Sequence, residues 1–312
     1  MNGGMSTELW PALRVEDWTP TRDTLHMWTQ IVGKIRMASA PMVNHWWQVP
    51  LYVSARGLTT SSIPYDQGCF DMEFDFVDQR LGVRTSTGGQ RSVRLAARPV
   101  ADFYAETMAA LGELGVDVTI RTTPTEVVRA IPFEQDDEHT AYEPDQARAF
   151  WGQLVNAQRV LTEFRSRFVG KVSPVHFFWG GLDMACTRFS GRTAPPHPGG
   201  APNCADWVMV EGYSHELSSA GFWPGFGEEG AFYAYAYPGP PGFREHPVAP
   251  AEAAYIDEAQ QFLLPYEAVR RAPDPDRYLL EFLQSTYEAA ADNAEWDREA
   301  LEADPSSPAR QL

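Results

Sequence analysis

The 312-residue chain has few cysteines, an excess of negative charge and no long apolar run. Its three cysteines are scattered and form no CxxC pair, which argues against a disulfide framework, a zinc ribbon and a thioredoxin-like motif. The formal net charge of −17 argues against a nucleic-acid-binding surface and against docking on anionic lipid. No segment approaches the roughly 18 apolar residues of a membrane helix, and no secretory signal is visible, so we expect a cytoplasmic protein.

Several catalytic signatures are also missing. The chain has no GxGxxG and no GxxxxGK[ST] motif, so neither a Rossmann dinucleotide site nor a P-loop is predicted. It has no GxSxG elbow, and the consecutive residues 214–216 would alternate between the faces of a strand, which prevents a Ser-His-Glu triad among them. Without an HExxH motif we predict no metal, and the sequence identifies no cofactor. The alternative is a scattered metal site, formed by His176, Asp183, His197, His215 and Glu216.

The composition is that of a protein with a large core, since 44% of the residues are hydrophobic and 12% are aromatic. Apolar periodicity predicts helices over residues 21–37, 99–114, 144–168, 251–271 and 274–302, and strands over 45–56, 69–77, 80–86, 91–97, 116–121, 175–188, 207–217 and 231–237. Because these strands follow one another without alternating helices, we predict an α+β fold of antiparallel sheets covered by helices. An acidic connection over 122–143 separates two halves, residues 21–125 and 144–303.

One pattern occurs in both halves. Ile31-Val32-Gly33-Lys34 precedes a proline and a predicted strand starting at His45, and Phe168-Val169-Gly170-Lys171 precedes a proline and one starting at His176. We interpret each copy as a helix that ends at glycine, with lysine near the negative end of the helix dipole. Internal duplication, giving one pseudo-symmetric domain, is our favoured interpretation, and chance similarity is the alternative. Duplication would place the two histidines at equivalent positions beside a pocket between the halves.

The repeat also supplies the candidate functional residues. Histidine transfers protons near neutral pH, and the neighbouring lysines and arginine can hold a carboxylate or a phosphate. The alternative is that each histidine is bonded to backbone and each lysine only caps a helix. The candidate catalytic residues are His45, His176, His215 and Glu216. The candidate ligand-binding residues are Lys34, Arg36, Lys171, Trp47, Trp179 and Trp223.

Five segments carry a family resemblance: WTQIVGKIR, VNHWW, SPVHFFWG, APPHPGG and YSHE. They resemble a bacterial family of proteins of this length that is catalogued only as a domain of unknown function. The resemblance covers nearly the whole chain and implies a soluble bacterial protein, but it brings no activity, cofactor or catalytic residue. From the residues themselves we expect a small organic ligand, with an anion as one candidate, in a cleft lined by histidine and aromatic side chains, with catalysis left open. The alternative is a non-catalytic protein-interaction or assembly module with exposed aromatic side chains.

Overall fold

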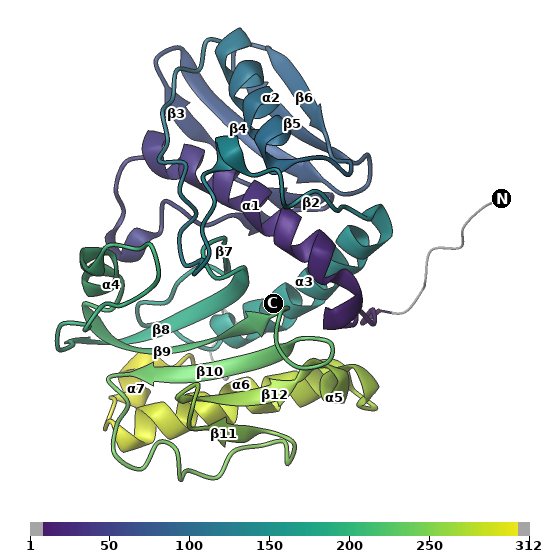
Figure 1. Ribbon diagram of the computed structural model, residues 1–312. Coiled ribbons are helices and arrows are strands. Elements are labelled where there is room, and N and C mark those ends of the chain that lie inside the picture. Colours follow the sequence, from purple (N-terminus) through teal and green to yellow (C-terminus); the bar gives the residue numbers. More distant parts are fainter. Residues whose placement is uncertain (1–8, 305–312) are drawn as a thin grey trace.

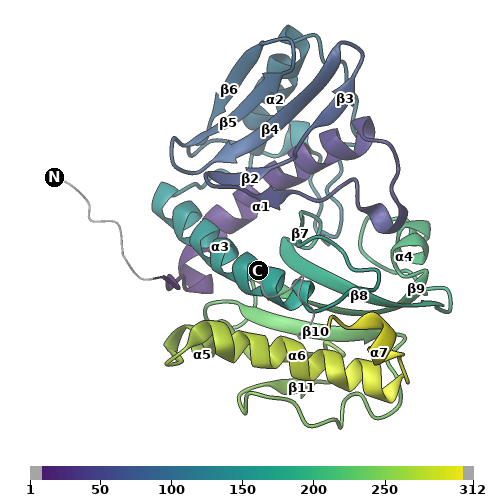
Figure 2. The same ribbon diagram turned by 180° about the vertical axis from the view of Figure 1, so that it is seen from behind.

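Two antiparallel six-stranded sheets form the frame of the molecule (Figure 1). The structure is a computed structural model, and it describes residues 9–304. The N-terminal sheet has the order β1-β2-β4-β5-β6, with β3 paired to β4, and the C-terminal sheet has the order β11-β12-β10-β9-β8-β7. Helix α1 lies between the two sheets in both views of the ribbon (Figures 1 and 2). This arrangement confirms the predicted α+β class.

The helices are α1 (Val15–Ser39), α2 (Val100–Glu113), α3 (Pro144–Ser166), α4 (Asp206–Gly212), α5 (Tyr266–Arg271), α6 (Pro275–Asn293) and α7 (Arg298–Leu301), with 3₁₀ turns η1 (Asn44–Trp46) and η2 (Phe133–Gln135). The strands are β1 (Tyr52–Val53), β2 (Gly57–Thr59), β3 (Ile63–Tyr65), β4 (Gly68–Asp75), β5 (Arg80–Thr85), β6 (Gln90–Arg94), β7 (His176–Phe178), β8 (Asp183–Thr193), β9 (His215–Trp223), β10 (Ala231–Tyr237), β11 (Ala254–Ile256) and β12 (Gln261–Pro265).

Strand β4 illustrates how the N-terminal sheet follows from its sequence. Phe70, Met72 and Phe74 alternate along the strand and are buried. Asp71 and Glu73 lie on the other face and form ion pairs with Arg84 of β5. Such cross-strand pairs stabilise a half-buried sheet only modestly, so burial of the apolar face determines the register.

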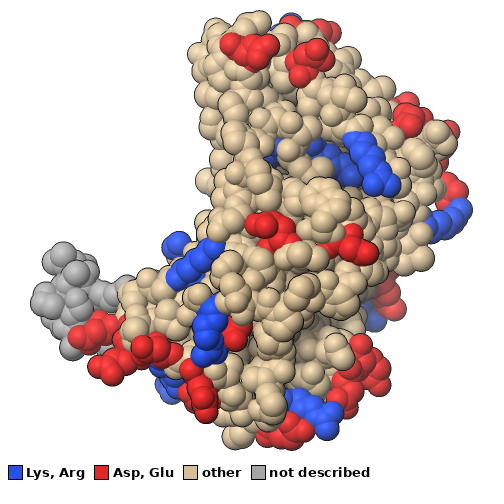
Figure 3. All heavy atoms as spheres, turned by 90° about the vertical axis from the view of Figure 1, so that its left-hand side faces the viewer, with Lys and Arg blue, Asp and Glu red and all other residues tan. Residues whose placement is uncertain are grey.

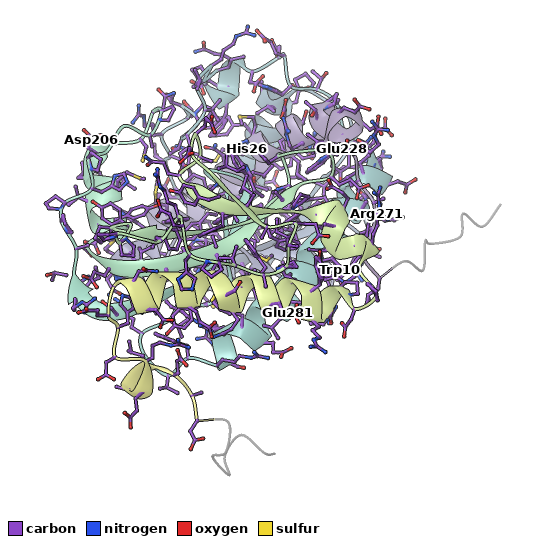
Figure 4. All side chains as sticks on the ribbon, turned by 90° about the horizontal axis from the view of Figure 1, so that it is seen from below. Trp10, His26, Asp206, Glu228, Arg271 and Glu281 are labelled. Carbon is purple, nitrogen blue, oxygen red and sulfur yellow. The ribbon has the colours of Figure 1, made fainter. Side chains whose placement is uncertain are left out.

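Helix α1 joins the two halves through a shared core. It is buried along most of its length, as expected of a helix that is covered on several sides. One continuous apolar cluster extends from β4 through α1 and α3 to the C-terminal sheet. Helix α6 lies across the lower side of that sheet, where Trp10 Nε1 donates a hydrogen bond to Asp276 Oδ1 over 3.3 Å (Figure 4). Within residues 9–304, no helix combines the length and apolar character of a membrane span.

The two copies of the repeat differ in local structure. Gly33 lies inside α1, which continues to Ser39, whereas Gly170 follows the end of α3, so the expected helix end at Gly33 is wrong. The predicted strand over 45–56 is wrong over most of its length, because His45 sits in the η1 turn with φ of 57° and only Tyr52–Val53 pairs as a strand. His45 and His176 therefore occupy unlike positions, and the internal duplication stays a prediction.

Five other predicted elements need correction. The predicted strand 175–188 is a hairpin, β7 and β8, because the chain turns at Gly180 and Gly181. The region 207–217 starts as α4 and enters β9 only at its end, and 116–121 belongs to neither sheet. The predicted helix 251–271 is mostly β11 and β12, because the open edge of β10 supplies hydrogen-bond partners, and α5 begins only after Pro265. The predicted helix 274–302 is divided into α6 and α7.

Gly33 provides a test of how closely α1 packs on the β7–β8 turn. A Cβ atom at Gly33 would lie 2.1 Å from Trp179 Nε1, and this indole is buried and donates to the Val49 carbonyl over 2.9 Å. We expect Gly33→Ala to lower the free energy of unfolding by about 1–3 kcal/mol through overpacking. Gly112→Ala in α2 has open space around its Cβ and should instead raise stability by about 0.5–1 kcal/mol. Urea unfolding of both variants measures the difference, and equal effects would contradict the tight contact.

Candidate functional site

The candidate site lies on the face of the C-terminal sheet that points away from α3 and α6. Met184, Cys186 and Phe222 point toward the helices and belong to the main core. The alternate residues of β8, including Ala185 and Phe189, point to the other face. The η1 turn and Trp47 pack on this face at Phe189, and α4 packs on the η1 turn. Figure 3 views the molecule from the side of α4, and most of the surface there is uncharged.

The η1 turn holds His45 and Trp46 in an uncommon backbone conformation. Their φ angles are 57° and 61°, in the left-handed region that residues other than glycine seldom adopt. Helix α4 supports both residues. The His45 amide donates to Glu211 Oε1 over 3.0 Å, and Trp46 Nε1 donates to the Val208 carbonyl over 3.0 Å. Strain of this kind is typical of functional segments, where the surrounding structure fixes the geometry.

The His45 ring contacts the only lysine near this turn. His45 Nδ1 donates to the Gly212 carbonyl over 3.1 Å, which leaves the Nε2 lone pair to accept from Lys171 Nζ at 2.6 Å. The His45 ring stacks on Phe189 at 4.5 Å between centroids and meets the His215 ring edge-on at 5.5 Å. Lys171 Nζ also lies 5.3 Å from the ring centroid of Trp47 and 5.1 Å from that of Phe189.

His176 lies behind Trp47 and is buried without a hydrogen-bond partner. The residue is 1% exposed, and neither ring nitrogen has a partner within residues 9–304. The rings of Trp47, Tyr52 and Phe178 surround it at 5.8, 5.7 and 5.3 Å between centroids. Burial, followed by repulsion from Arg36, lowers the pKa of His176 to about 3, so the imidazole is neutral at physiological pH.

The basic groups of this region, His45, Lys171 and Arg36, form no ion pair with a carboxylate within residues 9–304. Burial lowers the pKa of His45, with Lys171 as the next cause, and burial also lowers the pKa of Lys171 and of Arg36. The Glu211 carboxylate faces Lys171, and it accepts from the His45 backbone. Perturbed pKa values caused by burial and by neighbouring charges are typical of functional sites. The cluster of side chains described above is called the His45 site. It consists of His45, Trp47, Lys171, His176, Phe189 and His215.

The structure brings together only part of the predicted set. Arg36 joins the His45 site through Tyr52, whose ring centroid lies 5.2 Å from the Arg36 guanidinium. Four predicted residues lie apart from it. Lys34 donates to Thr125 Oγ1, Trp179 packs against Gly33, Trp223 stacks on Phe226, and Glu216 binds Arg192 and Ser190.

The sequence does not predict a second group of this region, the neighbouring carboxyl groups of Asp183 and Glu126. Asp183 accepts from the Tyr233 hydroxyl, and the Glu126 carboxyl lies over Gly180, where a Cβ atom would be 2.3 Å from Oε1. Burial raises the pKa of Asp183 to about 6. Glu126 reaches solvent on one side, but protein surrounds its carboxyl group elsewhere, and this burial together with Asp183 raises its pKa to about 7. The two glycines shortly before Asp183 are a sequence signal for a tight turn at this place. Glu126 lies in the acidic connection over 122–143, and no sequence signal marks it.

The scattered metal site is not assembled. No group of three His, Cys, Asp or Glu side chains within residues 9–304 is placed to hold a metal ion. Of the five residues of that alternative, His215 lies beside His45, whereas Asp183 is bonded to Tyr233 and Glu216 to Arg192.

Fold and site together define an α+β protein with a basic, aromatic site between a strained turn and the outer face of a sheet. The chain belongs to a family of unknown function (DUF5996), whose model matches residues 10–303. This match confirms the resemblance to a family of unknown function. Neither the curated proteins nor the solved structures that were compared with the chain gave a match.

Proposed function

We propose that the His45 site binds a small organic anion, a carboxylate or phosphate attached to an aromatic or apolar group. The observation that carries this proposal is the 2.6 Å contact between Lys171 Nζ and His45 Nε2, two basic groups without an ion-paired carboxylate among the described residues. In a chain of net charge −17, such a local excess of basic groups favours an anionic ligand. Lys171 is exposed, so the ammonium group can be reached from solvent.

The neighbouring side chains suit the rest of such a ligand. Trp47 and Phe189 offer aromatic surface beside Lys171. The nitrogens of His176 are buried polar atoms without a hydrogen bond to any residue among 9–304, and an unpaired buried polar group costs about 1–3 kcal/mol. Small-molecule sites are typically apolar with a few convergent polar groups, and these residues have that character.

We further propose that the protein works in the cytoplasm of a bacterium and takes a small molecule rather than nucleic acid or a membrane as its partner. The net charge of −17 argues against nucleic acid and an anionic membrane as partners, and the three scattered cysteines fit a reducing cytoplasm. One observation favours the alternative of a protein-interaction module. Trp207 on α4 is 63% exposed and packs at 5.2 Å on Trp46, so a partner protein could cover it.

The anion site is tested with benzoate and phenyl phosphate as probes, by thermal shift and calorimetry. Loss of a charge-assisted contact costs about 1.4 kcal/mol or more, so Lys171→Gln and His45→Gln should each weaken binding at least tenfold. Arg129→Gln makes the same charge change at a side chain that is 80% exposed, and it should bind like the wild type. Equal affinity in Lys171→Gln and wild type would refute the site. If the wild-type protein binds neither probe and self-associates through Trp207, the interaction module is favoured instead.

A further inference from the structure

The chain uses lysine in only two places. Lys34 and Lys171 are its only lysines, and all other side chains with a permanent positive charge are arginines. Arginine holds an anion at least as well as lysine, but it does not lose its proton in proteins, whereas an amine can become a nucleophile. Lys34 is 2% exposed and bonded to Thr125. Lys171 is exposed at the His45 site, so it is the amine that a substrate can reach.

The geometry around Lys171 is that of an amine with a proton acceptor already in place. The Gly212 carbonyl fixes the hydrogen of His45 on Nδ1, so Nε2 directs its lone pair at Lys171 Nζ. Helix α4 and the two residues with positive φ hold the ring in this orientation. No carboxylate within residues 9–304 forms an ion pair with Lys171, although Glu211 faces it and favours its charged form. A nucleophile within hydrogen-bond reach of an oriented base is the arrangement used in covalent catalysis.

We propose that Lys171 attacks the carbonyl carbon of a small 2-oxo acid to form an imine, with His45 transferring the proton. This inference rests on the proposed function, because the carboxylate of the oxo acid would occupy the anion site. The ammonium of Lys171 attracts that carboxylate as it approaches, and the His215 ring lies nearby, at 5.5 Å from the His45 ring between centroids.

The proton balance of the step closes with the groups present. His45 Nε2 takes one proton from the Lys171 ammonium, and the freed amine attacks the carbonyl carbon, which gives a carbinolamine after one proton moves from nitrogen to oxygen. Protonated His45 then donates to the carbinolamine hydroxyl, which leaves as water while the C–N double bond forms. The products are a protonated imine, one water molecule and neutral His45, so the positive charge is conserved.

Phenylpyruvate is a suitable probe, because it adds a ketone to a ring and a carboxylate. The full-length protein is incubated with phenylpyruvate and sodium cyanoborohydride near pH 7, and the reduced adduct is mapped by peptide mass spectrometry. We expect labelling of Lys171 at least tenfold faster than that of a lysine peptide, and no labelling of Lys34, which serves as a control within the same chain. Phenyllactate lacks the ketone and should slow the reaction by competition. Labelling of Lys171 at the rate of the peptide would overturn the proposal.

Three further measurements keep the outcome unambiguous. His45→Gln should lower the labelling rate to that of the peptide, and His246→Gln, which changes a histidine beside Asn293, should not. If His45→Gln does not fold, the pH dependence of labelling in the wild type is measured instead. A half-maximal labelling rate at a pH below the usual lysine pKa supports activation, because burial lowers the pKa of Lys171. Lys171→Arg should keep phenylpyruvate binding and lose the adduct. Binding without an adduct in the wild type refutes only the imine, whereas no binding at all refutes the anion site.

Discussion

The variant His176→Phe is expected to resist acid unfolding better than the wild-type protein. The imidazole of His176 is enclosed by Trp47, Tyr52 and Phe178, and its nitrogens have no partner among residues 9–304. A phenyl ring has a similar shape and needs no hydrogen bond, so it should fit this space at small cost. In His176→Phe neither the folded nor the unfolded state contains the titrating imidazole.

The sign of the pH effect follows from the two protonation equilibria. In the unfolded chain the pKa of His176 is near its ordinary value of 6.5, whereas burial lowers it to about 3 in the folded protein. Between these values the unfolded state binds more protons, so stability falls as the pH decreases from 6.5 toward 3. At pH 4 the loss amounts to about 3 kcal/mol, and His176→Phe should remove it.

Urea unfolding at pH 7 and at pH 4 measures this effect. The difference in unfolding free energy between the two pH values should shrink in His176→Phe and stay unchanged in His246→Gln. Equal pH dependence in wild type and His176→Phe would show that the ring is hydrated or partnered in the folded state. If an anion supplies the missing partner, the stable variant should also bind benzoate more weakly, a trade between stability and function.

Apolar patterning predicted the parts of the fold in which a long segment has one buried face. The alternation of Phe70, Met72 and Phe74 predicts β4, and helical periodicity predicts α1, α2 and α3. Short apolar runs were ambiguous. Strand β12 is apolar at three consecutive residues, a pattern that a buried helix shares, and only the neighbouring β10 decides the outcome.

The site was harder to predict than the fold because its central contact crosses the repeat. The sequence pattern pairs Lys34 with His45 and Lys171 with His176, each within one copy. In the folded protein Lys171 contacts His45, 126 residues away, and Lys34 lies elsewhere beside Thr125. The contact between Lys171 and His45 depends on the left-handed turn at His45 and on α4, and neither has a local sequence signal. The sequence pattern therefore singled out residues of the His45 site without their contacts, and their functional role stays a prediction.

The carboxyl pair yields the second large prediction, a rise in stability for Asp183→Asn at alkaline pH. Burial raises the pKa of Asp183 from 3.8 to about 6 in the folded protein. A group whose pKa is raised on folding stabilises the fold below its unfolded pKa, and this contribution is lost as the pH rises through the folded value. At pH 8 the ionised carboxylate therefore costs the fold up to about 3 kcal/mol, which asparagine does not incur.

Asparagine suits this position in other respects. Its oxygen can accept from the Tyr233 hydroxyl as Asp183 does, and its amide can donate toward Glu126, whose carboxyl lies over the adjacent Gly180 and Gly181. We expect Asp183→Asn to unfold at higher urea concentration than the wild type at pH 8 and at nearly the same concentration at pH 4. Asp137→Asn, at an exposed residue, is the matched control and should change little at either pH.

The direction of the result distinguishes two accounts of the pair. A stabilised Asp183→Asn at pH 8 means that the native carboxylate is held at a cost, which is typical of groups placed for acid–base chemistry or ligand contact rather than for stability. A destabilised variant would instead mean that the ionised Asp183 is well solvated or paired and that the fold depends on its charge. Glu126→Gln extends the test. Because repulsion from Asp183 contributes to the raised pKa of Glu126, the two substitutions should stabilise less together than the sum of their separate effects.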